Sequence, residues 1–169
     1  MSQTFPEDDS IGLPIGAPEP KPVRVLLIDD DDDEVSLTRS LLAGVEGVRY
    51  ELHRVATFDE GLASIALDDH DAYLVDHELG GRTGVELVRE AREAGSLAAL
   101  IMLTGRRDRT TDLAAMDAGA TDFLLKGATD AGLLDRTLRY AISQAAMVSA
   151  LEQSRDLMAG LIRATRWPG

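Results

Sequence analysis

The sequence contains no cysteine among its 169 residues. Neither a disulfide framework nor a thiolate metal site is therefore possible, and nothing in the chain indicates an oxidising compartment. The chain also lacks a basic start followed by an apolar run, and no stretch approaches the roughly 18 continuous apolar residues that a membrane span needs. These absences predict a protein of the reducing cytoplasm that is neither secreted nor inserted into a membrane.

Positive charge is scarce: 17 lysines and arginines stand against 30 aspartates and glutamates, and the net charge is -13. Binding to a phosphate backbone depends on clustered Lys and Arg side chains that release counterions. The composition therefore argues against a nucleic-acid partner. Most of the acidity is interpreted as an aid to solubility, but the acidic run from Asp29 to Glu34 directly follows a hydrophobic segment and needs its own explanation.

Proline is concentrated at one end of the chain. Residues 1–22 hold all but one of the 6 prolines among polar and acidic residues without periodicity, so this segment is predicted to be a flexible leader. After it, strand-like and helix-like patterns alternate. The predicted strands are 23–28, 50–55, 72–75, 97–103 and 122–125, and the predicted helices are 35–42, 59–67, 84–94, 108–118 and 130–166.

This alternation with short connections predicts right-handed crossovers and a parallel sheet covered by helices on both faces. The predicted fold class is therefore α/β, a doubly wound five-stranded parallel sheet. Residues 23–145 are expected to form this domain, and residues 146–169 a C-terminal helical extension. In such folds the ligand site lies beyond the carboxyl ends of the strands.

Polar side chains stand at the carboxyl ends of four predicted strands: Asp29, Asp30, Asp76, Thr104 and Lys126. Three neighbouring carboxylates repel one another unless a cation neutralises them, and oxygen ligands with room for water suit Mg²⁺. Lys126 supplies a fixed positive charge and Thr104 a hydroxyl donor, which together would hold the oxygens of a phosphoryl group. These residues predict an Mg²⁺-assisted phosphoryl acceptor with Asp76 as the nucleophile.

The sequence resembles the receiver domain of bacterial two-component response regulators over about residues 23–145. The resemblance rests on VLLIDDD at the first predicted strand, AYLVDHELGG at the third, IMLTG at the fourth and DFLLKG at the fifth. It implies a flavodoxin-like fold and a phosphorelay switch that takes a phosphoryl group from a histidine kinase or a histidine phosphotransfer protein. Such a domain catalyses only its own phosphorylation and dephosphorylation, either alone or as the front end of a longer signalling protein.

The resemblance also implies a set of metal ligands. Asp76 would be both the phosphoacceptor and a ligand, Asp30 a direct ligand and Asp29 a ligand through water. The backbone carbonyl of Glu78 would complete the protein ligands. Glu78 is further predicted to pair with Arg106, because these oppositely charged residues, two beyond Asp76 and Thr104, match positions that flank the entrance to the phosphorylation site in the family.

A switch is implied in the same way. Thr104 and Lys126 match the family's hydroxyl and lysine, and Phe123 matches its switch aromatic. Phosphorylation is expected to pull Thr104 inward and to let Phe123 rotate, which would alter the face formed by the fourth helix, the fifth strand and the fifth helix. The sequence departs from the family at Gly127, where proline usually follows the lysine; glycine can form this turn through φ > 0 without a cis peptide bond.

One rival function is a phosphatase that works through an aspartyl-phosphate intermediate, because Asp76 and Glu78 are spaced as a nucleophile and a general acid/base might be. Chain order argues against it, since such phosphatases, by family resemblance, carry the nucleophile after their first strand and need a capping insertion. His77 is interpreted as non-catalytic. His53 and His70 have no partners in the sequence pattern and are predicted to be surface residues.

The acidic run has two further interpretations. A calcium loop of the EF-hand type would need glycine where Glu34 stands and a helix rather than a strand before it, so this interpretation is rejected. The residues from Asp31 to Glu34 are instead predicted to favour the start of the first helix through its dipole.

The last predicted helix is far longer than the fold requires, since 1.5 Å per residue over 130–166 gives roughly 55 Å. A heptad seam runs along its far half: Met147, Leu151, Ser154, Met158, Leu161 and Thr165. Two chains are predicted to pair along this seam as a parallel homodimer. The alternative is a helix that folds back on its own domain or melts beyond Gly160.

Overall fold

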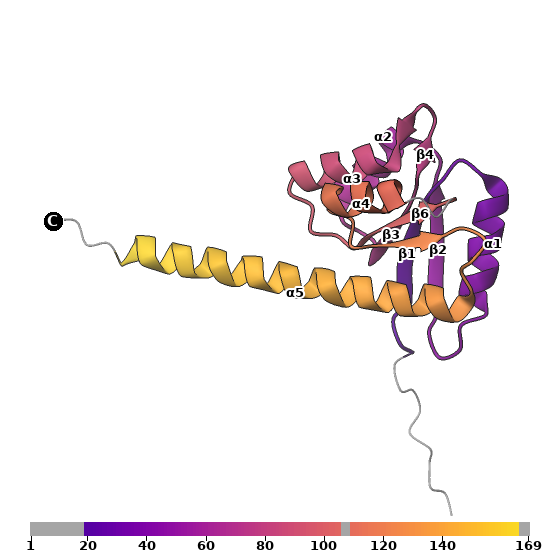
Figure 1. The fold of residues 1–169 in the computed structure, drawn as a ribbon. Helices are drawn as coiled ribbons and strands as arrows, with labels where there is room; N and C mark the ends of the chain where they lie inside the picture. Colours follow the sequence, from indigo (N-terminus) through magenta and orange to yellow (C-terminus); the bar gives the residue numbers. More distant parts are fainter. Residues whose placement is uncertain (1–18, 106–108, 166–169) are drawn as a thin grey trace, which may run out of the picture.

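The computed structural model describes residues 19–105 and 109–165 and has a five-stranded parallel sheet at its centre (Figure 1). The strands are β1 (Val23–Ile28), β2 (Tyr50–Val55), β3 (Ala72–Asp76), β6 (Leu100–Thr104) and β7 (Asp122–Leu125). Their spatial order is β2-β1-β3-β6-β7, so the direction of winding reverses between β1 and β3. This confirms the predicted doubly wound fold and places a ligand crevice at the ends of β1 and β3.

Helices cover both faces of the sheet: α1 (Asp32–Ala43), α2 (Phe58–Leu67), α3 (Gly84–Glu93), α4 (Arg109–Ala118) and α5 (Ala131–Ala164). Figure 1 shows α1 and α5 on one side and the other three helices on the opposite side. Leu42 and Leu138 pack with Leu27 in one core, and Ile65 packs with Ile28 in the other. Consecutive strand residues thus face opposite cores, which explains why the strands are nearly continuous runs of apolar residues.

The predicted strand 97–103 begins later than expected, at Leu100. The first pair across the sheet is Tyr73 with Leu100. In the segment before Leu100, the Arg92 side chain donates a hydrogen bond to the backbone oxygen of Ser96 at 2.9 Å, and the Ser96 N–H donates to the backbone oxygen of Ala91. These bonds hold the residues after α3 as a loop, although their side chains suit a strand.

A short hairpin between β3 and α3 was missing from the sequence prediction. It consists of β4 (Glu78–Leu79) and β5 (Arg82–Thr83), which pair antiparallel. Gly80 and Gly81 form its turn with φ values of 59° and 91°. Positive φ at both central residues is the requirement of a type I′ turn, so the Gly-Gly pair was a usable signal.

The last helix confirms the predicted length as far as the structure describes it. Its N-cap is Asp130, whose side chain accepts a hydrogen bond from the Leu133 N–H at 2.7 Å. Figure 1 shows its far half extending away from the sheet. Residue 166 and residues 1–18 of the predicted leader lie outside the described residues. Within the described ranges, no helix is both long enough and apolar enough to cross a membrane.

Candidate functional site

Three carboxylates meet where β1 and β3 end. Asp29 and Asp30 follow β1, and Asp76 is the last residue of β3. One oxygen from each lies within 4.8 Å of the other two. Asp29 and Asp76 are 0% and 8% exposed, whereas Asp30 faces solvent. The structure therefore brings together the acidic side chains that the sequence predicted to converge, with one open to an incoming ion.

Lys126 closes the site from β7. Its Nζ lies 2.8 Å from Asp76 Oδ1 and 3.0 Å from Asp29 Oδ2, and its backbone N–H donates to the Thr104 oxygen. Burial opposes the charged form, but the hydrogen bonds to Asp76 and Asp29 outweigh it and raise the pKa of Lys126. The following residue, Gly127, has the predicted positive φ, at 78°. Lys126 is therefore held as a fixed ammonium between two carboxylates.

The site still carries an excess of negative charge. Burial raises the pKa of Asp76, and the neighbouring Asp29 raises it further, while hydrogen bonds from Lys126 and from the His77 N–H act in the opposite direction. One ammonium cannot neutralise three carboxylates. Because the donors are all carboxylate oxygens and Asp30 is open to water, the residues present fit Mg²⁺, which keeps several waters and uses few protein ligands.

Arg54 supports the acidic loop and was missed by the sequence prediction. It lies near the end of β2 and donates from Nε to the Asp29 carbonyl and from Nη2 to the Asp30 carbonyl, both at 2.9 Å. Its Nη1 is 3.1 Å from Asp32. Arg54 stands inside the predicted strand 50–55, one residue before its end, so a search beyond the strand ends does not single it out.

The start of α1 behaves as predicted. Asp31 is the N-cap, and its side chain accepts a hydrogen bond from the Asp33 N–H at 2.9 Å. The first turn contains Asp32, Asp33 and Glu34, whose negative charges interact favourably with the positive end of the helix dipole. The Asp31 N–H donates in turn to Asp29 Oδ1 at 2.9 Å, so the cap also fixes the buried carboxylate.

The backbone of Asp76 is pressed against the start of α3. A Cβ built on Gly84 would lie 2.1 Å from the Asp76 oxygen and 2.9 Å from Met102 Cε. The Gly84 N–H donates to the His77 oxygen at 2.8 Å. Only glycine permits this approach, so the residue after the hairpin helps to fix the position of the candidate nucleophile.

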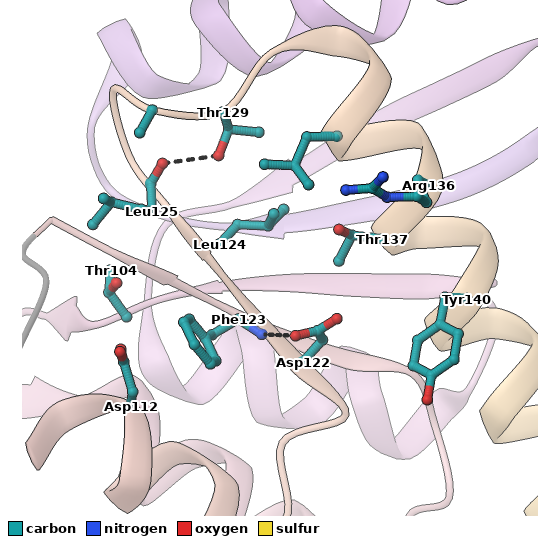
Figure 2. A pocket seen from close by; sticks show the side chains of 12 residues that line it. Thr104, Asp112, Asp122, Phe123, Leu124, Leu125, Thr129, Arg136, Thr137 and Tyr140 are labelled. Carbon is teal, nitrogen blue, oxygen red and sulfur yellow. Dashed lines mark hydrogen bonds between the residues drawn. The ribbon is translucent and has the colours of Figure 1, made fainter. Parts of the chain in front are cut away.

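Thr104 connects two cavities. The first, of about 810 Å³, contains the acidic site and is also lined by Glu78 and Lys126. The second, of about 710 Å³, lies between α4, β7 and α5, where Figure 2 shows Phe123 beside Thr104 and Asp112. Phe123 is 37% exposed and therefore points outward in this structure. Thr104, at 2% exposure, is the buried residue common to both cavities.

His53 is exposed, as predicted for a surface residue, but the same prediction for His70 was wrong. His53 Nδ1 and His70 Nε2 form a hydrogen bond of 2.8 Å, so they do have partners, and the His70 side chain is only 8% exposed. They lie 17 residues apart, and only the packing of β2 beside the rest of the sheet brings them together. His77 lines the acidic cavity. Arg106 and its predicted pairing with Glu78 lie outside the described residues.

Comparison with known sequences identifies relatives over most of the chain. The family model described as "Response regulator receiver domain" matches residues 25–138. The transcriptional regulatory protein FixJ of Azorhizobium caulinodans is 31% identical over 141 residues, which cover 82% of this chain and 63% of FixJ. KdpE, the KDP operon transcriptional regulatory protein of Escherichia coli K12, is 30% identical over 127 residues, which cover 75% of this chain and 54% of KdpE. The chain thus spans about half to two thirds of the length of these relatives.

Solved structures show the same fold. A CheY-like response regulator receiver domain protein from Methanospirillum hungatei JF-1 matches with a TM-score of 0.63 and 28% identity, over 75% of this chain and 99% of that chain. The receiver domain of a sensor histidine kinase from Pseudomonas aeruginosa PAO1, which has a magnesium ion in its active site cleft, matches with a TM-score of 0.63 and 23% identity, over 73% and 99%. Because the family match runs from β1 into α5, the chain belongs to the response regulator receiver domain family, whose members are phosphoacceptor domains of two-component signalling.

Proposed function

We propose that the chain accepts a phosphoryl group on Asp76 from the phosphohistidine of a histidine kinase or a histidine phosphotransfer protein. The observation that carries this proposal is the position of Lys126 Nζ, 2.8 Å from Asp76 Oδ1 at the end of β3. A carboxylate there offers a nucleophilic oxygen, and a fixed cation lies where the phosphoryl oxygens would arrive. The names of FixJ and KdpE describe regulation of transcription by those whole proteins; this chain corresponds to part of each.

Asp29, Asp30, Asp76 and the backbone carbonyl of Glu78 are the proposed metal ligands. Mg²⁺, when bound, would supply positive charge for the phosphoryl oxygens. An Asp76 carboxylate oxygen attacks phosphorus, the P–N bond of the donor breaks, and its electron pair leaves with the imidazole, which takes up a proton. Lys126 stays protonated throughout and holds the oxygens of the group on Asp76.

The readout of this event is proposed to pass through Thr104. Its side chain is buried between the acidic cavity and the cavity of α4, β7 and α5 (Figure 2). Movement of Thr104 toward the phosphoryl oxygens would vacate space beside Phe123, whose outward ring could then rotate inward. The face formed by α4, β7 and α5 is therefore the proposed output surface of residues 23–145.

A second copy of the chain is the other partner that we propose, through residues 146–169. The predicted seam residue Leu151 is 68% exposed, and Met147, Met158 and Leu161 are exposed as well. Val148, Leu157 and Ile162 are also exposed and fall at the e and g positions beside the seam. At roughly 100 Å² for each side chain, these seven would bury about 1,400 Å² between two copies, the size of a standard interface.

The proposed acceptor is tested by incubating the chain with acetyl phosphate and MgCl₂ and counting acid-labile phosphate. The wild type is expected to take up at most one phosphate per chain, Asp30→Asn to lose most of the labelling with its metal ligand, and Asp76→Asn to take up none. Undiminished labelling of Asp76→Asn would contradict the assignment. Repeated turnover of a phosphate monoester such as p-nitrophenyl phosphate would instead favour the phosphatase alternative.

A further inference from the structure

A histidine cluster lies outside the acidic site. His53 on β2 and His70 in the loop before β3 meet edge to face, with ring centroids 5.0 Å apart and an interplanar angle of 82°. Their facing nitrogens, His53 Nδ1 and His70 Nε2, are 2.8 Å apart. Two imidazole nitrogens from separate elements thus point at one another at the exposed edge of the sheet.

His70 is held rigidly in this position. Its Nδ1 lies 2.7 Å from Asp69 Oδ1, and its ring packs edge to face on Tyr73 at 5.7 Å. The carboxylate can only accept a proton there, so His70 carries its hydrogen on Nδ1 and presents the lone pair of Nε2 to His53. His53 therefore donates its Nδ1 hydrogen to that lone pair, and because its ring is exposed it can change to the Nε2–H tautomer.

We propose that His53 Nδ1 and His70 Nε2 bind a borderline divalent cation, with Zn²⁺ as the probe. Paired imidazoles suit Zn²⁺, Cu²⁺ or Ni²⁺, whereas the carboxylates of the acidic site suit Mg²⁺. A histidine whose other nitrogen bonds to a carboxylate is the usual form of a metal ligand, because the carboxylate fixes the tautomer and raises the basicity of the ring. Asp69 supplies that carboxylate to His70.

Binding requires a small movement and a change of tautomer at His53. Zn–N bonds of about 2.0 to 2.1 Å in a tetrahedral site place the two nitrogens about 3.3 Å apart, so the present 2.8 Å must widen. The exposed His53 can move by this amount, while the buried His70 stays in place. As the cation binds, His53 loses its hydrogen from Nδ1 and takes one up at its exposed Nε2, so the ring changes tautomer without net release of a proton, and waters complete the coordination.

Titration calorimetry of the whole chain with ZnCl₂, in excess MgCl₂ to occupy the acidic site, tests this proposal. The wild type is expected to bind one Zn²⁺. His53→Gln and His70→Gln should each weaken binding at least tenfold, and Asp69→Asn by about 10- to 100-fold. The matched control is His77→Gln, which changes the remaining histidine and should leave this Zn²⁺ affinity unchanged.

Equal Zn²⁺ affinity in the wild type and in His53→Gln would overturn the proposal, because the hydrogen bond between the rings would then be only a structural contact. His53 is the decisive position, since its side chain is exposed and its replacement leaves the core intact. As a direct readout, the ¹⁵N signals of His53 Nδ1 and His70 Nε2 should shift on addition of Zn²⁺. Shifts confined to His77 would also contradict the assignment.

Discussion

At the scale of residues, the electrostatics of the site depend on Lys126. Asp29 and Asp76 are both buried, and this one ammonium is hydrogen-bonded to each of them. Without it, two carboxylates would remain buried without a cation, which is far more costly than the loss of an exposed ion pair. The same arrangement that prepares the site for a phosphoryl group therefore also stabilises the fold.

Lys126→Ala is expected to lower the free energy of unfolding by about 2 to 4 kcal/mol in EDTA, because it leaves both carboxylates unpaired. Saturating MgCl₂ should restore part of this loss in the variant, since the ion takes over the neutralisation. Urea unfolding with and without Mg²⁺ measures both effects. Lys21→Ala, which removes an exposed lysine, is the control and should be nearly neutral. Equal stability of the two variants in EDTA would contradict the proposed role of Lys126.

The acidic residues and Lys126 were predictable because alternating patterns locate the ends of strands, and in a parallel sheet those ends meet at one edge. Arg54 was not, because it lies within its strand, one residue before the end at Val55. The contact between His53 and His70 was not predictable, because it depends on where a loop packs against an edge strand, and no local pattern encodes that. The orientation of Phe123 likewise depends on the packing of α4 beside β7.

At the scale of elements, the hairpin β4–β5 and the start of α3 help to fix the position of the Asp76 backbone. Thr83 and Glu86 form a capping box: Glu86 Oε2 accepts from the Thr83 N–H at 2.7 Å, and Thr83 Oγ1 accepts from the Glu86 N–H at 3.2 Å. The cap fixes α3 at Gly84, which in turn contacts the Asp76 backbone. The position of Asp76 is therefore fixed by the start of α3 as well as by the end of β3.

Gly84→Ala is expected to destabilise the chain by about 2 to 4 kcal/mol, because its Cβ would clash with a backbone oxygen that cannot move without shifting Asp76. The rate of labelling by acetyl phosphate should fall as well. Gly160→Ala in α5 is the matched control: a Cβ there meets nothing within 4 Å, so helix propensity should raise stability by up to about 1 kcal/mol. Similar stabilities for the two variants would disprove the close packing at Gly84.

Glu86 gives the capping box a pH dependence. Hydrogen bonds from the Thr83 N–H and hydroxyl lower the pKa of Glu86 below its usual 4.5. A carboxylate whose pKa is lower in the folded state contributes stability above the unfolded pKa and loses it as the pH falls through the folded pKa. Glu86→Gln is therefore expected to melt below the wild type at neutral pH, with a difference that closes in acid. A difference that stays constant across this pH range would contradict the assignment, and Glu93→Gln at the exposed end of α3 is the control.

At the scale of the whole molecule, α5 has two parts: its first turns pack against the sheet, and its far half carries exposed apolar side chains. Its first turns pack Leu134 and Leu138 into the core, and Tyr50 anchors it by a 2.7 Å hydrogen bond to Asp135. Between residues 146 and 165 the large apolar side chains are exposed. Residues 23–145 are therefore expected to be stable as a monomer, whereas residues 146–169 are expected to need a second copy of the chain to bury their apolar side chains.

Sedimentation equilibrium should find the whole chain dimeric and a version that ends at Ala145 monomeric. The expected reason is burial of the seam, with most of the association energy in its apolar side chains. Leu151→Glu should yield monomers, whereas Gln153→Glu, at a position outside the seam, should not. Monomers for the whole chain at high concentration with Asp76 phosphorylated would contradict pairing through α5.

The fold was predictable from sequence in its order of elements, because buried parallel strands and amphipathic helices have distinct periods. The patterns did not predict features that depend on single contacts, such as the hairpin turn at Gly80 and Gly81 and the late start of β6. The far half of α5 was predicted to carry a heptad seam along which two chains pair; its apolar side chains are exposed in this structure, and the pairing stays a prediction.

The central claim is that Asp76 forms an acyl phosphate, and locating that bond tests it most directly. After reaction of the whole chain with acetyl phosphate and MgCl₂, reduction with borohydride converts a phosphorylated aspartate to homoserine, which tandem mass spectrometry assigns to one residue. Homoserine is expected at residue 76, and it should be absent when EDTA replaces MgCl₂ in the reaction. Homoserine at residue 29 or 30, or phosphate recovered on a side chain other than an aspartate, would contradict it.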